Sequence, residues 1–222
     1  MVVIPAYQAV RTIGPLVAEI RALGLPVTVV DDASTDGTAE EAQAAGASVI
    51  RREVNGGKGA ALREGVSVVL QSQCEWILMI DADGQHLAAE IPLFLKEAQQ
   101  SGADLLVGNR MERPSGMPLD RRLTNRFMSW LISRLAGQRI PDTQCGFRMI
   151  RRRVMETLQL VSNRFEVESE MIVLGAWAGF QITSVPVSSI YRRQSSFIRP
   201  IRDTLRFLFF LWRLQKEHPR GG

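Results

Sequence analysis

The sequence predicts an α/β fold in which a mostly parallel β-sheet carries helices on both faces. Short apolar runs alternate, along the first half of the chain, with segments whose apolar residues recur every three or four positions. Several of these runs end in charged residues, as strands do where their carboxyl ends form a ligand-binding edge. Strands that alternate with helices connect through crossovers, which make the strands parallel and place the helices on the faces.

The first half of the chain supplies the regular part of this pattern. Runs rich in β-branched residues predict strands, and amphipathic segments predict helices. Gly46 is expected to end the second helix, and a glycine-rich turn is expected to begin the third. The strands are predicted over 2–5, 25–30, 48–52, 76–80 and 103–110, and the helices over 12–23, 38–47, 57–71 and 90–102.

The second half is less regular but contains the same kinds of element. We predict one domain over residues 1–193, followed over residues 194–222 by an amphipathic helix and a tail. The elements expected between residue 110 and the end of the domain are a loop over 111–122, a helix over 123–137, a loop that runs into a strand over 140–152, a helix over 164–179 and a strand over 180–193.

Composition restricts the class of protein. The 222 residues are 45% hydrophobic and 23% charged, an ordinary mixture for a globular domain. Cys74 and Cys145 are the only cysteines, so the sequence predicts neither a disulfide framework nor a zinc motif, and a cytoplasmic setting is expected. The net charge of +4 is compatible with nucleotide phosphates, an anionic membrane or nucleic acid, and does not select among them. Nucleic-acid binding is not expected, because the arginines are dispersed and lack interleaved stacking aromatics.

The segment MIDADGQH contains the candidate metal ligands. Asp81 and Asp83 directly follow a buried strand, and two carboxylates one residue apart repel each other unless a cation lies between them. Mg²⁺ and Mn²⁺ prefer oxygen ligands and commonly bind one or two carboxylates together with substrate phosphates. Gln85 would add an oxygen, and His86 would be a ligand or a hydrogen-bonding residue. A solvated Asp/Gly turn is the alternative interpretation.

Two further motifs indicate a nucleotide or another anion. In VVDDASTDGT, Asp31 and Asp32 follow an apolar strand, where a carboxylate can accept hydrogen bonds from a base or a ribose. A capped helix start is the alternative there. In NGGKGAALREG, glycines surround Lys58 at a helix start, which suits an anion but lacks the P-loop spacing. A plain glycine turn would also produce this pattern.

Arginines are frequent in the second half, and arginine binds phosphate through paired hydrogen bonds. Arg110 and Arg148 are the preferred phosphate ligands, because each follows a strand or turn that faces the polar edge of the predicted sheet. The other candidates are Arg113, Arg121, Arg122, Arg126, Arg192 and Arg193.

The last predicted helix, over 199–216, combines a basic stripe with bulky apolar residues. Arg202, Arg206 and Arg213 fall on one side of it. Its apolar run is too short to span a bilayer, so the helix is expected to lie at a membrane interface. A core helix or a helix that packs a homodimer is the alternative.

Taken in order, the motifs resemble those of family 2 glycosyltransferases with the GT-A fold. They are VVIPAYQ, VVDDASTDGT, NGGKGAA, MIDADGQH, GNR, DTQCGFRMI and FEVESEM, and the similarity extends from Val2 to about Arg193. It is greatest to the dolichol-phosphate mannose synthase and polyprenyl-phosphate glycosyltransferase branch. This resemblance implies an inverting, metal-dependent transfer of a hexose from GDP-mannose or a UDP-sugar to a polyprenyl or dolichyl phosphate, with the enzyme peripheral on the cytoplasmic face of the membrane.

The motifs and the resemblance together assign expected roles to individual residues. Asp81, Asp83 and Arg110 are the expected catalytic residues, and Asp81, Asp83 and Gln85 would hold Mg²⁺ or Mn²⁺. The nucleotide sugar would be bound by Pro5, Tyr7, Asp32, Lys58, Asp81 and Ala82. The acceptor phosphate would be bound by Arg110, Arg121, Asn125, Arg148 and Arg193.

Departures from the family pattern leave the donor sugar and the acceptor open. Ala9 replaces an acidic residue, and QSSFIRP replaces a segment with a lysine, so Arg193 or Arg199 would have to supply that charge. An acceptor phosphate needs no general base, whereas a hydroxyl acceptor needs one. The alternatives are therefore a soluble transferase that acts on a hydroxyl, or a non-catalytic membrane-surface scaffold with this fold. Candidates for the base are Asp142, Glu166, Glu168 and Glu170.

Overall fold

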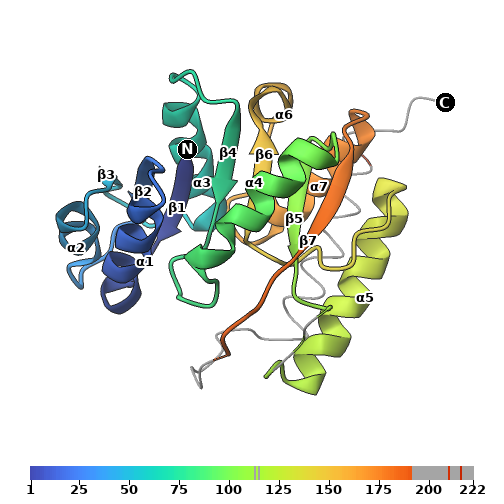
Figure 1. Cartoon of the computed structure of the whole chain (residues 1–222), viewed down its shortest axis with the longest axis horizontal. Helices are drawn as coiled ribbons and strands as arrows, with labels where there is room; N and C mark the ends of the chain where they lie inside the picture. Colours follow the sequence, from blue (N-terminus) through green and yellow to red (C-terminus); the bar gives the residue numbers. More distant parts are fainter. Residues whose placement is uncertain (113, 115, 192–209, 211–215, 217–222) are drawn as a thin grey trace. The chain divides into compact units, whose positions relative to one another are not determined.

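The computed structural model describes residues 1–112, 114, 116–191, 210 and 216 (Figure 1). Apart from residues 210 and 216, the predicted C-terminal helix lies outside this part of the chain, as do Arg113, Arg192 and Arg193. The unit Met1–Tyr191 contains a seven-stranded sheet of order β3-β2-β1-β4-β6-β5-β7. Its strands are β1 (Val2–Ala6), β2 (Val27–Asp31), β3 (Ser48–Arg51), β4 (Trp76–Met79), β5 (Leu105–Asn109), β6 (Arg148–Arg151) and β7 (Ile182–Pro186).

The sheet is mostly parallel, as predicted. β1 pairs in parallel with β2 and β4, β2 with β3, and β5 with β7. β6 runs antiparallel between β4 and β5. Because β4 and β5 are both antiparallel to β6, they point the same way. The carboxyl ends of β1, β2, β4 and β5 therefore share one edge of the sheet, which we call the carboxyl edge.

Helices cover both faces of the sheet, which confirms the predicted α/β class. α1 and α4 lie on one face, and α3 and α7 lie on the other (Figure 1). α5 packs against α7. It begins at Leu119, inside the predicted loop, since Pro118 precedes its first turn in an extended conformation and Asp120 suits a helix N-terminus. The helices are α1 (Val10–Ala22), α2 (Thr38–Ala44), α3 (Lys58–Val69), η1 (Ala88–Glu90), α4 (Ile91–Gln100), α5 (Leu119–Ala136), α6 (Arg152–Thr157) and α7 (Glu166–Trp177).

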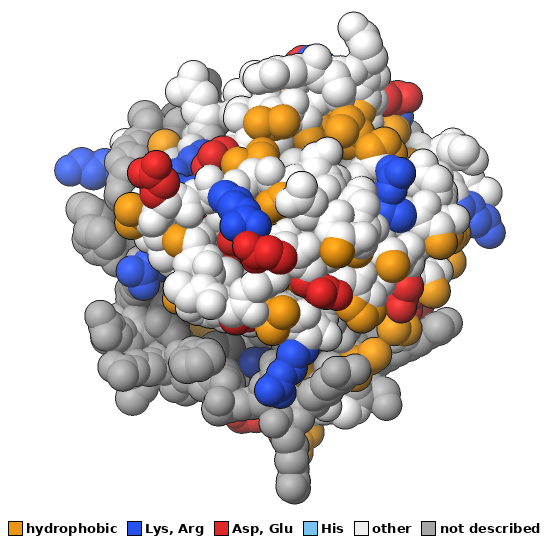
Figure 2. Space-filling model, turned by 90° about the vertical axis from the view of Figure 1, so that its left-hand side faces the viewer, with side chains coloured by type: hydrophobic (Ala, Val, Ile, Leu, Met, Phe, Trp, Pro, Cys, Tyr) orange, Lys and Arg blue, Asp and Glu red, His pale blue; other side chains and the backbone are white. Residues whose placement is uncertain are grey.

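The surface beside β3 carries charges of both signs. Figure 2 views the molecule from this side, and its acidic and basic side chains are interspersed. Ion pairs such as Arg51–Glu40 join neighbouring elements in this region. This face therefore offers no patch of one sign among its described residues. No helix in the described part of the chain has the length and apolar character required to cross a bilayer.

α3 approaches the sheet closely through a glycine. A Cβ atom at Gly65 would lie 2.6 Å from Cγ1 of Val3 and 2.8 Å from Cγ2 of Val30, and both valines are fully buried. Glycine inside a helix normally lowers stability. Here it allows α3, whose first residue is Lys58, to pack closely against β1 and β2.

Gly65→Ala is expected to lower the free energy of unfolding by about 1–3 kcal/mol, because the added methyl group would overpack α3 against the sheet. Gly175→Ala in α7 is the matched control, since no atom of the described residues outside its own helix lies within 4 Å of the added Cβ. That variant should be neutral or up to about 1 kcal/mol more stable. Urea unfolding of both variants measures the difference, and equal effects would contradict this account of the α3 contact.

Candidate active site

The candidate residues gather at the carboxyl edge, where strained backbone also occurs. Gln8 follows β1 and Ala33 follows β2, and these two non-glycine residues have positive φ angles of 53° and 63°. The Gln8 amide donates a hydrogen bond of 2.9 Å to Ser34 Oγ, which joins the two strand ends. Strain of this kind is concentrated at functional sites in proteins.

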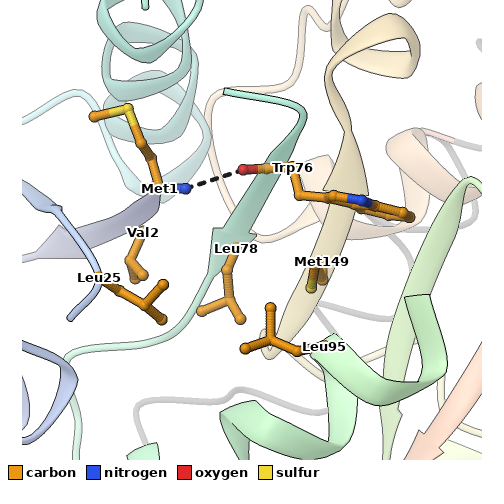
Figure 3. A pocket seen from close by; sticks show the side chains of 7 residues that line it. All are labelled: Met1, Val2, Leu25, Trp76, Leu78, Leu95 and Met149. Carbon is orange, nitrogen blue, oxygen red and sulfur yellow. Dashed lines mark hydrogen bonds between the residues drawn. The ribbon is translucent and has the colours of Figure 1, made fainter. Parts of the chain in front are cut away.

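A small cavity at the opposite edge of the sheet is not a candidate for the substrate site. It has a volume of about 40 Å³ and lies at the amino ends of β1 and β4, where Met1 donates a hydrogen bond to the Trp76 carbonyl (Figure 3). Sites for ligands the size of a nucleotide sugar are several hundred Å³ and include polar groups. The side chains around this cavity are those of Met1, Val2, Leu25, Trp76, Leu78, Leu95 and Met149.

Lys58 connects Asp81 to α7. Its Nζ lies 2.5 Å from Asp81 Oδ1 and also forms an ion pair with Glu168. Burial would lower the pKa of Lys58, but the two carboxylates outweigh this effect and raise the pKa well above its ordinary value. Burial would likewise raise the pKa of Asp81, and Lys58 instead holds that pKa below its ordinary value. Lys58 is therefore a fixed cation, and Asp81 is a fixed anion.

Asp83 is exposed and lies beside this pair. Partial loss of solvent and the charge of Asp81 raise the pKa of Asp83, although the Gln85 amide donates a hydrogen bond of 2.9 Å to Oδ1. Because the charge of Asp81 contributes to this raised pKa, a cation beside both carboxylates would be favoured here.

The donor set at this position fits Mg²⁺ or Mn²⁺. Within the described ranges, no group of three or more His, Cys, Asp or Glu side chains could hold a metal. At this position the protein would contribute the carboxylates of Asp81 and Asp83 and the side-chain amide oxygen of Gln85. A hard divalent ion with few protein ligands completes its shell with water and phosphate oxygens.

Gly146 makes room for Asp81. A Cβ atom at Gly146 would come within 3.0 Å of Cγ and both carboxylate oxygens of Asp81. The loop before β6 therefore passes directly over the carboxylate and restricts its orientation. The glycine of the DTQCGFRMI motif is explained by this contact.

Arg110 is held by Asp142 in a buried, two-point ion pair. Nε and Nη2 of Arg110 donate to the two carboxylate oxygens at 2.7 and 2.9 Å, and the Arg110 amide donates to the same group. Asp142 is 0% exposed. The charge of Arg110 helps to lower the pKa of Asp81, so this arginine belongs to the electrostatic surroundings of the metal position.

Arg148 requires a correction, because its side chain is in the core. It is 1% exposed, and its guanidinium donates to the main-chain carbonyls of Cys145, Thr143 and Glu168. A phosphate could reach these donors only if the loop before β6 moved. The geometry favours a structural role, in which Arg148 ties that loop to α7, over the expected contact with an acceptor phosphate.

Asp32 also binds protein groups, although it was expected to bind the base of the nucleotide. Its carboxylate accepts hydrogen bonds from the amides of Gly56 and Gly57, at 3.0 and 2.7 Å, and forms an ion pair with Arg52. Asp32 thus shapes the glycine turn that begins α3.

The glycine turn itself is covered by another part of the chain. The Gly59 amide donates to the Asn163 carbonyl at 2.9 Å, and a Cβ at Gly57 or Gly59 would collide with the main chain of 162–163. The glycines therefore admit a neighbouring backbone, and the amides of Gly59 and Ala60 donate to the Asn163 carbonyl. Lys58 alone extends from the turn to the metal position.

The remaining nucleotide candidates lie at the carboxyl edge with different exposure. Tyr7 is exposed after β1, and Pro5 is half-buried within it. Ala82 is buried, and its carbonyl accepts a hydrogen bond of 2.5 Å from Thr12 Oγ1. His86 is buried behind them, which lowers its pKa to about 4, and its Nδ1 has no hydrogen-bond partner in the described part of the chain.

The acceptor candidates on α5 are Arg121 and Asn125. The Arg121 guanidinium lies 5.7 Å from the centre of the Tyr191 ring, and Asn125 is half-buried on the same helix. Arg193, the remaining candidate, lies outside the described residues.

Residues 1–159 match the model of the family described as Glycosyl transferase family 2. The chain belongs to this family. It is 34% identical over 204 residues to glycosyltransferase AglJ of Haloferax volcanii, covering 90% of this chain and 66% of that protein. It is 27% identical over 207 residues to undecaprenyl-phosphate mannosyltransferase of Micrococcus luteus, covering 86% and 84%.

The GT-A fold is shared with solved structures. One is glucosyl-3-phosphoglycerate synthase from Mycobacterium tuberculosis in complex with Mn²⁺ and UDP-glucose, with a TM-score of 0.74 and 20% identity over 97% of this chain and 77% of that one. At this level of identity the likeness establishes the fold alone. It confirms the predicted fold class for this family 2 glycosyltransferase.

The family 2 motifs did not predict the roles that Glu168, Asp142 and Gly146 have in the structure. Glu168 and Asp142 were considered only as general bases, whereas they hold Lys58 and Arg110. Gly146 was part of a motif without a role. Two features of the sequence could have indicated these roles. Glu168 is an acidic residue within the apolar helix 164–179, and Asp142 is an acidic residue shortly before the CGF triplet. Their partners are distant in sequence and could not be read from it.

Gly146→Ala is expected to displace the Asp81 carboxylate and to abolish Mn²⁺-dependent thermal stabilisation by GDP or UDP. The ratio kcat/KM should fall by on the order of 100-fold, as misplacement by about 1 Å can do. Gly175→Ala is the control, since it adds the same methyl group away from the site. Retention of nucleotide-dependent stabilisation in Gly146→Ala would contradict the role of Asp81.

Arg148→Met is expected to lower the free energy of unfolding by about 3 kcal/mol, since buried carbonyls would lose their donor. The KM for the acceptor should not change in protein that remains folded. Arg11→Met, at an exposed position on α1, is the control and should be neutral. A raised acceptor KM with unchanged stability would restore Arg148 as a phosphate ligand.

Proposed function

We propose that this glycosyltransferase transfers a hexose from GDP-mannose or a UDP-sugar to a polyprenyl phosphate, with inversion at the anomeric carbon. One observation carries this proposal: Asp142, Glu168 and Glu170, which were considered as general bases, are engaged by other protein groups. Asp142 binds Arg110, and Glu168 binds Lys58. Glu170 is fully buried and accepts hydrogen bonds from the Val161 and Ser162 amides. An acceptor phosphate is already anionic and needs no such base.

The second support comes from the relatives. Undecaprenyl-phosphate mannosyltransferase is one of them, and its name specifies a lipid-phosphate acceptor. Another is a UDP-N-acetylglucosamine--dolichyl-phosphate N-acetylglucosaminyltransferase from Methanococcus voltae, 28% identical over 151 residues. The chain spans 60% of that protein, so the use of a dolichyl-phosphate acceptor by this chain is a part of the proposal.

In the proposed reaction, Asp81, Asp83 and Gln85 would hold Mg²⁺ or Mn²⁺. The bound ion would offset the negative charge that develops on the leaving group. Lys58 keeps Asp81 ionised and oriented, and it adds positive charge at the same position. Arg110, fixed by Asp142, adds a second preorganised charge, and Arg121 and Asn125 on α5 would orient the acceptor phosphate for attack.

The acceptor is tested with purified full-length protein, Mn²⁺ and a panel of GDP-mannose, UDP-glucose and UDP-N-acetylglucosamine. Each donor is paired with polyprenyl phosphate, dephosphorylated polyprenol or 3-phosphoglycerate, and products are identified by mass spectrometry. We expect product only with polyprenyl phosphate. Asp83→Asn should lower kcat by about 100-fold or more, because the charge of the diphosphate would no longer be offset. Glu19→Gln on α1 is the control and should be fully active.

Other outcomes would identify other functions. Equal turnover of polyprenol or 3-phosphoglycerate would contradict the phosphate acceptor, and loss of that turnover in Glu166→Gln would then indicate a hydroxyl acceptor with a general base. Absence of turnover, together with absence of thermal stabilisation by any nucleotide with Mn²⁺, would contradict catalysis and favour the scaffold.

A further inference from the structure

α5 has apolar residues on two opposite faces, although only one of them meets the core. Met128, Ile132 and Ala136 are buried on the inner face. The large apolar residues of the outer side are between 51% and 75% exposed, and their spacing of three or four positions places them within about 80° of each other around the helix axis. They are Leu119, Leu123, Phe127 and Trp130.

Arginines lie within the same stripe. At about 100° per residue, Arg126 falls at one border of it, and Arg134 falls between Leu123 and Phe127. Both arginines are exposed, and the Arg134 guanidinium lies 5.7 Å from the centre of the Trp130 ring. Phe127 and Trp130 stack with their ring centres 6.1 Å apart. We call Leu119, Leu123, Arg126, Phe127, Trp130 and Arg134 the outer face of α5.

The charge of the helix selects among the occupants that could cover this face. α5 contains four arginines and one acidic residue, Asp120. Residues 194–222 of the same chain contain six basic and two acidic residues, so they would bring like charge to it. A second copy that met this face through a two-fold axis would do the same, because each side would present the same arginines. An anionic partner complements the face.

We propose that the outer face of α5 docks onto an anionic lipid bilayer. Exposed leucine and aromatic side chains beside arginines are the combination that binds helices in the plane of a membrane interface. The apolar side chains would enter the acyl boundary, and Arg126 and Arg134 would pair with lipid phosphates. The proposal goes beyond the proposed reaction, since the outer face contains none of the residues to which that reaction gives a role and its lipid binding needs no substrate.

The test uses the full chain and sucrose-loaded vesicles of phosphatidylcholine and phosphatidylglycerol in equal amounts, without polyprenyl phosphate. We expect sedimentation with the vesicles and a blue shift of tryptophan emission. Leu123→Ser with Phe127→Ser, and separately Arg126→Glu with Arg134→Glu, should each weaken the vesicle partition coefficient at least tenfold. All four side chains are exposed or at the outer face, so the thermal unfolding midpoints should not change.

Matched controls place equal changes on other surfaces. Val54→Ser with Leu93→Ser removes two exposed apolar side chains, and Arg11→Glu with Lys96→Glu reverses two exposed charges. These variants should bind as the wild type does, apart from a small general charge effect. Binding by both α5 variants at the wild-type level would overturn the proposal and assign lipid binding elsewhere. Absence of wild-type binding, or a dimer that the serine variant alone dissociates, would also overturn it.

Discussion

The candidate active site depends on the ion pairs that join Lys58 to Asp81 and Glu168. Asp81 follows β4, Lys58 begins α3, and Glu168 lies in α7, so one ammonium group connects three elements that are distant in sequence. Buried charges are costly unless each is paired, and here the one positive charge of Lys58 stands against the three carboxylates of Asp81, Asp83 and Glu168, which leaves negative charge in excess. The excess negative charge would attract a divalent cation. When no cation is bound, Lys58 lowers the free-energy cost of keeping these carboxylates ionised.

Close backbone contacts hold this charge cluster in place. Gly65 brings α3 against the sheet, Gly59 admits the main chain of 162–163, and Gly146 lies over the Asp81 carboxylate. Glu170 fixes the segment before α7 by accepting two of its amides, and Arg148 ties the loop before β6 to the same helix. α7 therefore acts as the support behind the site, although it was predicted only as an apolar helix with several acids.

The sequence predicted the elements of the sheet and the edge at which its candidate residues gather, because both follow from local patterns. β-branched runs and helical spacing identify strands and helices, and strand ends identify the carboxyl edge. The partners of individual charges did not follow. Asp32, Arg110 and Arg148 were each expected to face a ligand, and each is bound by another part of the chain. A charged side chain next to a strand end can bind a ligand or pair with another part of the same chain, and only the packed structure shows which of the two it does.

The two proposals place different demands on α5, and its geometry can meet both. Arg121 and Asn125 lie roughly 200° and 240° around the helix from Leu119, on the side away from the outer face. A helix whose outer face rested on a bilayer would therefore hold these polar residues above the lipid phosphates. Because a helix is about 10 Å across, a polyprenyl phosphate anchored in the same bilayer would have to extend its head group by about that distance to reach them. In that arrangement the apolar side chains of the outer face would hold the enzyme at the membrane. Arg126 and Arg134 would bind the lipid surface, and Arg121 would orient the acceptor phosphate.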